Sequence, residues 1–172
     1  MRQACPPATP TAAPCGASGS PDDARAKAAG VTAASYYSPR LNVVLEFVEG
    51  PSTVDEILTL KSIPVRMGHV NTQTRVLAFV QNEDPVQSDQ LNSFGSRLMS
   101  ELPEYSGTRT AVVTRHIAPA TRVTVLAYDT ATNQSIRAFF TLRAALSFLS
   151  LDQRDLLEAF PEARSLILKQ MA

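Results

Sequence analysis

Val76-Leu77-Ala78-Phe79-Val80 is a continuous apolar run, and Ala111-Val112-Val113 nearly repeats it farther along the chain. Strands covered on both faces show such unbroken runs, whereas half-exposed strands alternate apolar and polar residues. Between the two runs, Asp84-Pro85-Val86-Gln87 has the form of a helix N-terminus, and apolar residues follow at helical spacing, namely Leu91, Phe94, Leu98 and Leu102. A helix that crosses between two buried strands makes them a parallel pair, so these residues predict an α/β fold.

The preceding segment extends this pattern. Residues 35–48, interrupted at Pro39, predict a hairpin that ends at Gly50-Pro51. Ser52 can then cap a helix with Asp55 at its third position. Residues 63–74 have no firm period and predict a connection in which a short strand can occur.

The following segment contains one ambiguous stretch. Residues 119–131 fit a helix, because Pro119 suits a helix start, or a strand, because β-branched residues follow. Residues 135–140 predict a strand, after which Thr141 caps a helix. Ser150-Leu151-Asp152-Gln153 is a second capping box, so a further helix is expected there, continuing or restarting after Pro161.

Composition divides the chain into three parts. Residues 1–32 are rich in Ala, Pro, Thr, Ser and Gly and predict a disordered tail, because they offer too little apolar surface to offset the entropy of ordering. Residues 33–150 carry the α/β pattern, and residues 151–172 predict a C-terminal helical extension. We therefore expect one α/β domain with a tail and an extension.

Charge and cysteine content narrow the class of protein. The chain has 172 residues, with 16 Lys and Arg against 16 Asp and Glu, so its formal charge of zero argues against a nucleic-acid or membrane-surface binder. Cys5 and Cys15 both lie in the predicted tail and cannot cross-link the domain. The first residues lack the apolar run of a secretory signal, and no stretch approaches the roughly 18 apolar residues of a membrane span. We expect a cytoplasmic protein with no integral membrane segment.

Specific phrases accompany this order of elements. They are residues 41–50 followed by Val54-Asp55-Glu56-Ile57, then residues 109–114, then Ser135-Ile136-Arg137-Ala138-Phe139-Phe140 leading into residues 145–149. Over residues 35–150 the chain resembles the SpoIIAA-like group of STAS-related bacterial proteins. The resemblance implies a SpoIIAA-like (STAS-type) mixed sheet of four or five strands, with helices packed mainly on one face.

The resemblance also implies a class of function. Related STAS domains are protein-interaction switches, notably anti-sigma-factor antagonists that are phosphorylated on a serine at the start of a helix. The stretch from Asn82 to Ser88 lacks the Asp-Ser-Ser-Gly-type motif of those antagonists, so the sequence departs here from their phosphorylation switch. Ser88 is a candidate phosphosite, with a helix cap or an ordinary surface serine as the alternatives. The group is also similar to lipid-transfer CRAL–TRIO domains, which implies a small apolar ligand as an alternative.

Polar side chains follow the two central strands. In open α/β sheets, ligands bind beyond the carboxyl ends of parallel strands, so this edge is the candidate cleft for a ligand or partner. Its residues are Asn82, Glu83, Asp84, Arg115 and His116. Helix capping accounts for Asp84 and a solvated turn accounts for Arg115 and His116, so the sequence predicts no catalytic residue here.

Neither a metal nor a cofactor is expected. His69 and His116 are 47 positions apart and have no cysteine nearby, which is not the spacing of a metal site. No glycine-rich phosphate motif or nucleophile motif is found in the sequence.

The C-terminal extension carries more apolar side chains than a free tail would, namely Leu156, Leu157, Phe160 and Ile167. They either pack on the domain itself or form an interface with a partner protein or a second copy of the chain, in which case a homodimer is expected. The sequence thus predicts a non-enzymatic regulatory or protein-interaction domain, with a carrier of a small apolar or lipid-like ligand as the alternative and an enzyme as a distant third.

Overall fold

The computed structural model describes residues 27–28, 31–50, 52–81, 88–117, 119, 121 and 135–171. Its sheet has five main strands and a two-residue strand at one edge, and the strands follow one another across the sheet in chain order. The strands are β1 (Lys27–Ala28), β2 (Val31–Ser38), β3 (Val43–Glu49), β4 (Arg75–Val80), β5 (Arg109–Val113) and β6 (Ser135–Phe139). The pairs β1–β2 and β2–β3 are antiparallel, whereas β3 to β6 are mutually parallel, so the sheet is mixed, as predicted.

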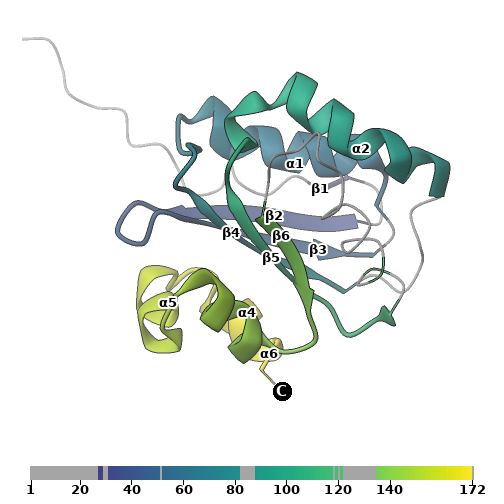
Figure 1. The fold of residues 1–172 in the computed structure, drawn as a ribbon. Coiled ribbons are helices and arrows are strands. Elements are labelled where there is room, and N and C mark those ends of the chain that lie inside the picture. The colour runs from purple at the N-terminus through teal and green to yellow at the C-terminus, as the bar shows by residue number, and fades with distance from the viewer. Residues whose placement is uncertain are drawn as a thin grey trace, which may run out of the picture.

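Helices cover both faces of this sheet (Figure 1). On one face lie α1 (Val54–Arg66) and α2 (Ser88–Glu101), followed by the short 3-10 helix η2 (Pro103–Tyr105). On the opposite face lie α4 (Leu142–Leu149), α5 (Gln153–Ala159) and α6 (Arg164–Lys169). The prediction that helices pack mainly on one face is therefore wrong, and the fold is a three-layer α/β/α arrangement.

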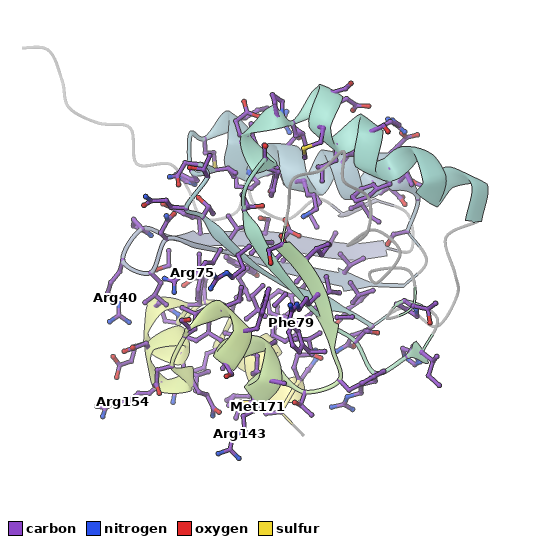
Figure 2. All side chains as sticks on the ribbon, in the orientation of Figure 1. Arg40, Arg75, Phe79, Arg143, Arg154 and Met171 are labelled. Atoms are coloured by element: carbon purple, nitrogen blue, oxygen red, sulfur yellow. The ribbon has the colours of Figure 1, made fainter. Side chains whose placement is uncertain are left out.

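Successive side chains of each buried strand enter different cores, because strand residues alternate between the two faces. On β3, Val44 packs with α1 and α2, whereas Leu45 and Phe47 pack with α4, α5 and α6. Phe79 of β4 stacks on Phe47 with ring centroids 4.9 Å apart, and Figure 2 shows it between the sheet and the α4–α6 layer. Two cores explain why the central strands read as unbroken apolar runs.

The start of α1 lies one residue later than predicted. Thr53, not Ser52, is the N-cap, and Glu56, not Asp55, completes the capping box: Thr53 Oγ1 accepts from the Glu56 backbone N–H at 3.2 Å, and Glu56 Oε2 accepts from the Thr53 N–H at 2.7 Å. The helix also continues through Pro64 to Arg66, where a connection was predicted. Leu60 and Pro64 are buried on this helix, which continues although proline cannot donate a backbone hydrogen bond.

The sheet begins inside the predicted tail. β2 starts at Val31 and pairs with β1, so the boundary at residue 32 is too late; most of the predicted tail lies outside the described residues. The pairing of β2 with β3 holds the start of β2 in place, and composition alone does not reveal this pairing. The ambiguous stretch 119–131 also falls almost entirely outside the described residues.

The C-terminal helices are joined by two tight turns. Thr141 caps α4 as predicted, with its Oγ1 accepting from the Ala144 N–H at 3.3 Å. Ser150 is not a helix N-cap: it ends α4 in the left-handed conformation (φ 54°), and Asp152 caps α5 instead. The chain then breaks at Phe160 and restarts as α6 after Pro161. In the described part of the chain, no helix is long and apolar enough to cross a bilayer.

Candidate functional site

A groove lies at the carboxyl ends of β4, β5 and β6, the place where open α/β sheets bind ligands. We call this generalisation the strand-end rule. It consists of two adjoining open cavities of about 300 Å³ and about 510 Å³, which share Arg115, Phe140 and Gln170. The smaller cavity is bounded by the last residues of β4 and β5, and the larger one by the start of α4 and the end of the chain. We call this feature the carboxyl-end groove.

Phe140 occupies the border between the two cavities and is 59% exposed. Its neighbour Phe139 packs against Phe148 in the core below, with ring centroids 5.3 Å apart. Because successive strand residues alternate in direction, the inward Phe139 sends the next side chain away from that core. Thr141 then starts α4, which holds the exposed ring at the mouth of the groove.

The described lining of the groove carries positive charge. Arg115 and Arg143 line it, and neither has an ion pair within the described part of the chain. Among the described residues, the other polar side chains of the lining are uncharged amides and hydroxyls or a histidine, namely Gln81, Thr114, His116, Thr141, Gln153 and Gln170. Guanidinium and amide groups donate hydrogen bonds to carboxylates and carbonyls, so among the described lining residues the groove favours a negatively charged occupant.

Apolar side chains flank the charges. Met171, from the segment after α6, is 42% exposed and lines the same cavity as Arg143; Figure 2 shows the two side chains close together below α4. Ile117, directly after His116, is 77% exposed. A ligand with both a negative charge and an apolar group would therefore find contacts for each.

The structure brings together two of the five predicted cleft residues. Arg115 and His116 line the groove, and the His116 backbone N–H donates to Thr114 Oγ1 at 3.2 Å, which fixes the turn after β5. Asn82, Glu83 and Asp84 lie outside the described residues, so the other side of the predicted cleft is not described. Ser88, the candidate phosphosite, is the first residue of α2, and its side chain lies outside the description.

The residues predicted as a possible interface lie inside the domain, whereas an interface requires them to be exposed. Leu156, Phe160 and Ile167 are completely buried in the core between the sheet and α4–α6, and Leu157 is partly buried against the same core. Of the two alternatives drawn from the sequence, these side chains follow the first, packing on the domain itself, and the burial of Leu156, Phe160 and Ile167 argues against the second, an intermolecular interface. The apolar spacing correctly indicated that these side chains are covered, and the surface that covers them is the sheet of the same chain.

Sequence reasoning missed Phe140, Arg143, Gln170 and Met171. Phe140 was interpreted as the last residue of a strand, and the other three lie on segments whose approach to the strand ends depends on how α4 and α6 pack. Arg143 could have been noticed from the sequence, because it lies in the first turn of the predicted helix, where a cation is unfavourable beside the helix dipole. Such a placement suggests a role other than helix stability.

No cluster of three or more His, Cys, Asp or Glu side chains suited to a metal ion is found among the described residues. What the described lining provides is a set of hydrogen-bond donors and exposed apolar surface, which is an arrangement for binding. Comparisons with protein-family models, with curated proteins and with solved structures give no significant match to this chain.

Proposed function

We propose that this chain is a non-enzymatic protein-interaction domain, related to the STAS group, that binds an acidic segment of a partner protein in the carboxyl-end groove. The observation that carries the proposal is the exposure of Phe140 in a cavity that Arg115 and Arg143 also line, while its neighbour Phe139 packs against the core. A large aromatic ring at the surface beside arginines is the residue combination typical of binding hot spots.

The alternative, a carrier of a small apolar molecule, has less support. Carriers enclose their ligand in an apolar cavity, but both parts of this groove are open and lined by arginine, glutamine and threonine as well as by Phe140 and Leu142. Native mass spectrometry of freshly purified protein separates the two functions. A carrier retains a co-purifying apolar molecule, whereas an interaction domain appears at the mass of the chain alone.

Selection from a random displayed-peptide library against the immobilised full chain tests the proposal. Enriched peptides should combine Asp or Glu with a large apolar residue, and their affinity should fall as salt rises, because exposed charges are screened over about 8 Å at physiological ionic strength. Replacing Arg115 and Arg143 by Glu should abolish the selection of acidic peptides. Enrichment of uncharged or basic peptides by the unmodified chain would contradict the proposal.

A further inference from the structure

A second cavity lies at the opposite end of the parallel strands, where these strands begin. It measures about 290 Å³ and is lined by the first residues of β4 and β5, the adjacent turns and the end of α4, namely Thr72, Gln73, Thr74, Arg75, Gly107, Arg109, Leu149 and Ser150. Arg75 and Arg109 are direct neighbours in the register of the sheet, so both guanidinium groups project from the same face at the same level. We call this cavity the amino-end pocket.

The two arginines contact backbone carbonyls rather than carboxylates. Arg75 Nη1 donates to the carbonyls of Leu149 and Ser150 at 3.1 and 3.2 Å, and its Nη2 donates to the Leu41 carbonyl. Arg109 Nη1 donates to the Phe148 carbonyl at 3.3 Å. No ion pair within the described part of the chain involves either arginine.

Capping of α4 accounts for the hydrogen bonds to the Phe148, Leu149 and Ser150 carbonyls, and the turn before β3 supplies the Leu41 carbonyl, but these contacts do not balance the charge. The C-terminal end of a helix carries about half an elementary negative charge, whereas Arg75 and Arg109 bring two full positive charges to it. Arg137 adds a third nearby, because its guanidinium and that of Arg109 both lie over the Phe148 ring, at 5.3 and 5.7 Å. More than one positive charge is left without a described counterion.

The proximity of like charges affects Arg75. Burial, and secondly the positive charge of Arg109, lower the pKa of the Arg75 guanidinium below its ordinary value. A bound anion would offset both effects. Each guanidinium has five N–H donors, so donors remain after the carbonyl contacts, and Gln73 and Ser150 add exposed polar groups at the rim.

We propose that the amino-end pocket binds the phosphate group of a small phosphorylated molecule. A phosphate monoester carries close to two negative charges at neutral pH and accepts forked hydrogen bonds from arginine, which matches the excess charge of the Arg75–Arg109 pair. The pocket volume lies near the lower end of the range for small-molecule sites, so it has room for a small group attached to the phosphate. The formal charge of zero for the whole chain argues against nucleic acid as the source of the phosphate.

The test is a titration of the ¹⁵N-labelled full chain at constant ionic strength with inorganic phosphate, glucose 6-phosphate or a phosphoserine peptide. Saturable amide shifts at Gly107, Gln73 and Arg109 are expected, with glucose 6-phosphate binding at least as tightly as inorganic phosphate. If neither inorganic phosphate nor glucose 6-phosphate saturates the shifts up to about 50 mM, the proposal is overturned, because even a weak site has a dissociation constant in the millimolar range. Tighter binding of the phosphoserine peptide than of both small probes would overturn the assignment to a small molecule.

Matched arginine variants locate the site. Arg109→Gln, at an exposed position, should weaken binding at least about tenfold, because it removes a charge-assisted contact. Arg143→Gln, in the carboxyl-end groove, should leave binding unchanged. If Arg143→Gln weakens binding while Arg109→Gln does not, the phosphate occupies the other groove and the proposal fails. The shifts in the unmodified chain report the site directly, so the result holds even if a variant folds poorly.

Discussion

Lys61 Nζ lies 2.9 Å from Glu46 Oε2 inside the layer between α1 and the sheet, and both side chains are almost completely buried. Tyr105 completes this cluster: its hydroxyl contacts Glu46 Oε1 at 3.4 Å and donates to the Lys61 carbonyl at 3.2 Å, and the Lys61 ammonium lies 4.7 Å from the centre of its ring. The pair joins β3 to α1 at a depth where an unpaired charge is costly.

Removing one member of this pair should destabilise the protein strongly. Lys61→Met leaves the Glu46 carboxylate buried without its cation, and we expect the free energy of unfolding to fall by about 3–5 kcal/mol. The double variant Glu46→Leu with Lys61→Met should recover most of this loss, because two apolar groups of similar volume need no partner. Urea unfolding measures both changes. A double variant as unstable as the single one would show that the ion pair itself stabilises the fold.

The stability at alkaline pH should depend on Tyr105. Burial, and then the negative charge of Glu46, raise the pKa of the Tyr105 hydroxyl far above its ordinary value. The folded state therefore keeps the proton while the unfolded state releases it, so this contribution is complete below about pH 10 and is lost above it, at about 1.4 kcal/mol per pH unit.

Tyr105→Phe is the control for that pH dependence. It should lower the free energy of unfolding at neutral pH by about 1 kcal/mol through lost hydrogen bonds. Above about pH 10, the free energy of unfolding of this variant should fall less steeply than that of the unmodified chain, by the contribution of one proton, about 1.4 kcal/mol per pH unit. Urea unfolding from pH 8 to 11 measures both effects. Parallel stability curves for the two proteins would contradict the prediction.

The α2 helix offers a buried and an exposed neighbour for comparison. Leu98 is 2% exposed in the core beneath α2, so Leu98→Asp should cost more than about 4 kcal/mol by burying an unpaired charge. Arg97 forms ion pairs with Asp55 at 2.7 Å and Glu101 at 2.9 Å on the surface, where such pairs contribute little, so Arg97→Asp should be mild. Similar losses for both variants, measured by thermal unfolding, would mean that the face of α2 is misassigned.

The C-terminal helices should be indispensable for folding. Because Leu156, Phe160 and Ile167 are buried in the core, truncation after Ser150 exposes that face of the sheet and should give an insoluble or unfolded product. Phe160→Ala should cost about 3–5 kcal/mol, whereas Leu168→Ala, at an exposed position, should have little effect. A soluble truncated chain with a cooperative unfolding transition would contradict this placement.

Local patterns predicted most elements of the fold but not the layer to which each helix belongs. The apolar run Val76–Val80 and the cap at Thr141 are local signals, and both were confirmed by β4 and α4. The apolar spacing of Leu156 and Phe160 predicted a covered helix, but spacing carries no information on what covers it. That α5 and α6 pack on the face opposite α1 follows from long-range contacts alone.

The site was predicted in part for the same reason. The strand-end rule led to Arg115 and His116 because they follow β5 in sequence. Met171 reaches the groove only because α6 returns to the strand ends, a tertiary relationship with no local signature. Phe140 directly follows β6, and it was missed because it was assigned to that strand. Arg75 and Arg109 begin two separate strands, and only the register β4–β5 shows that they are neighbours.

The most direct test of the proposed function compares two exposed apolar residues at different places on the surface. Phe140 lies in the carboxyl-end groove, and Met67, 63% exposed, follows the end of α1 and is not among the groove residues. Isothermal titration of a selected acidic peptide with the full chain should show that Phe140→Asp weakens binding at least about thirtyfold, a loss of about 2 kcal/mol at a hot spot, while Met67→Asp leaves it unchanged. Unchanged affinity in Phe140→Asp, or an equal loss in Met67→Asp, would contradict the assignment of the carboxyl-end groove as the partner-binding surface.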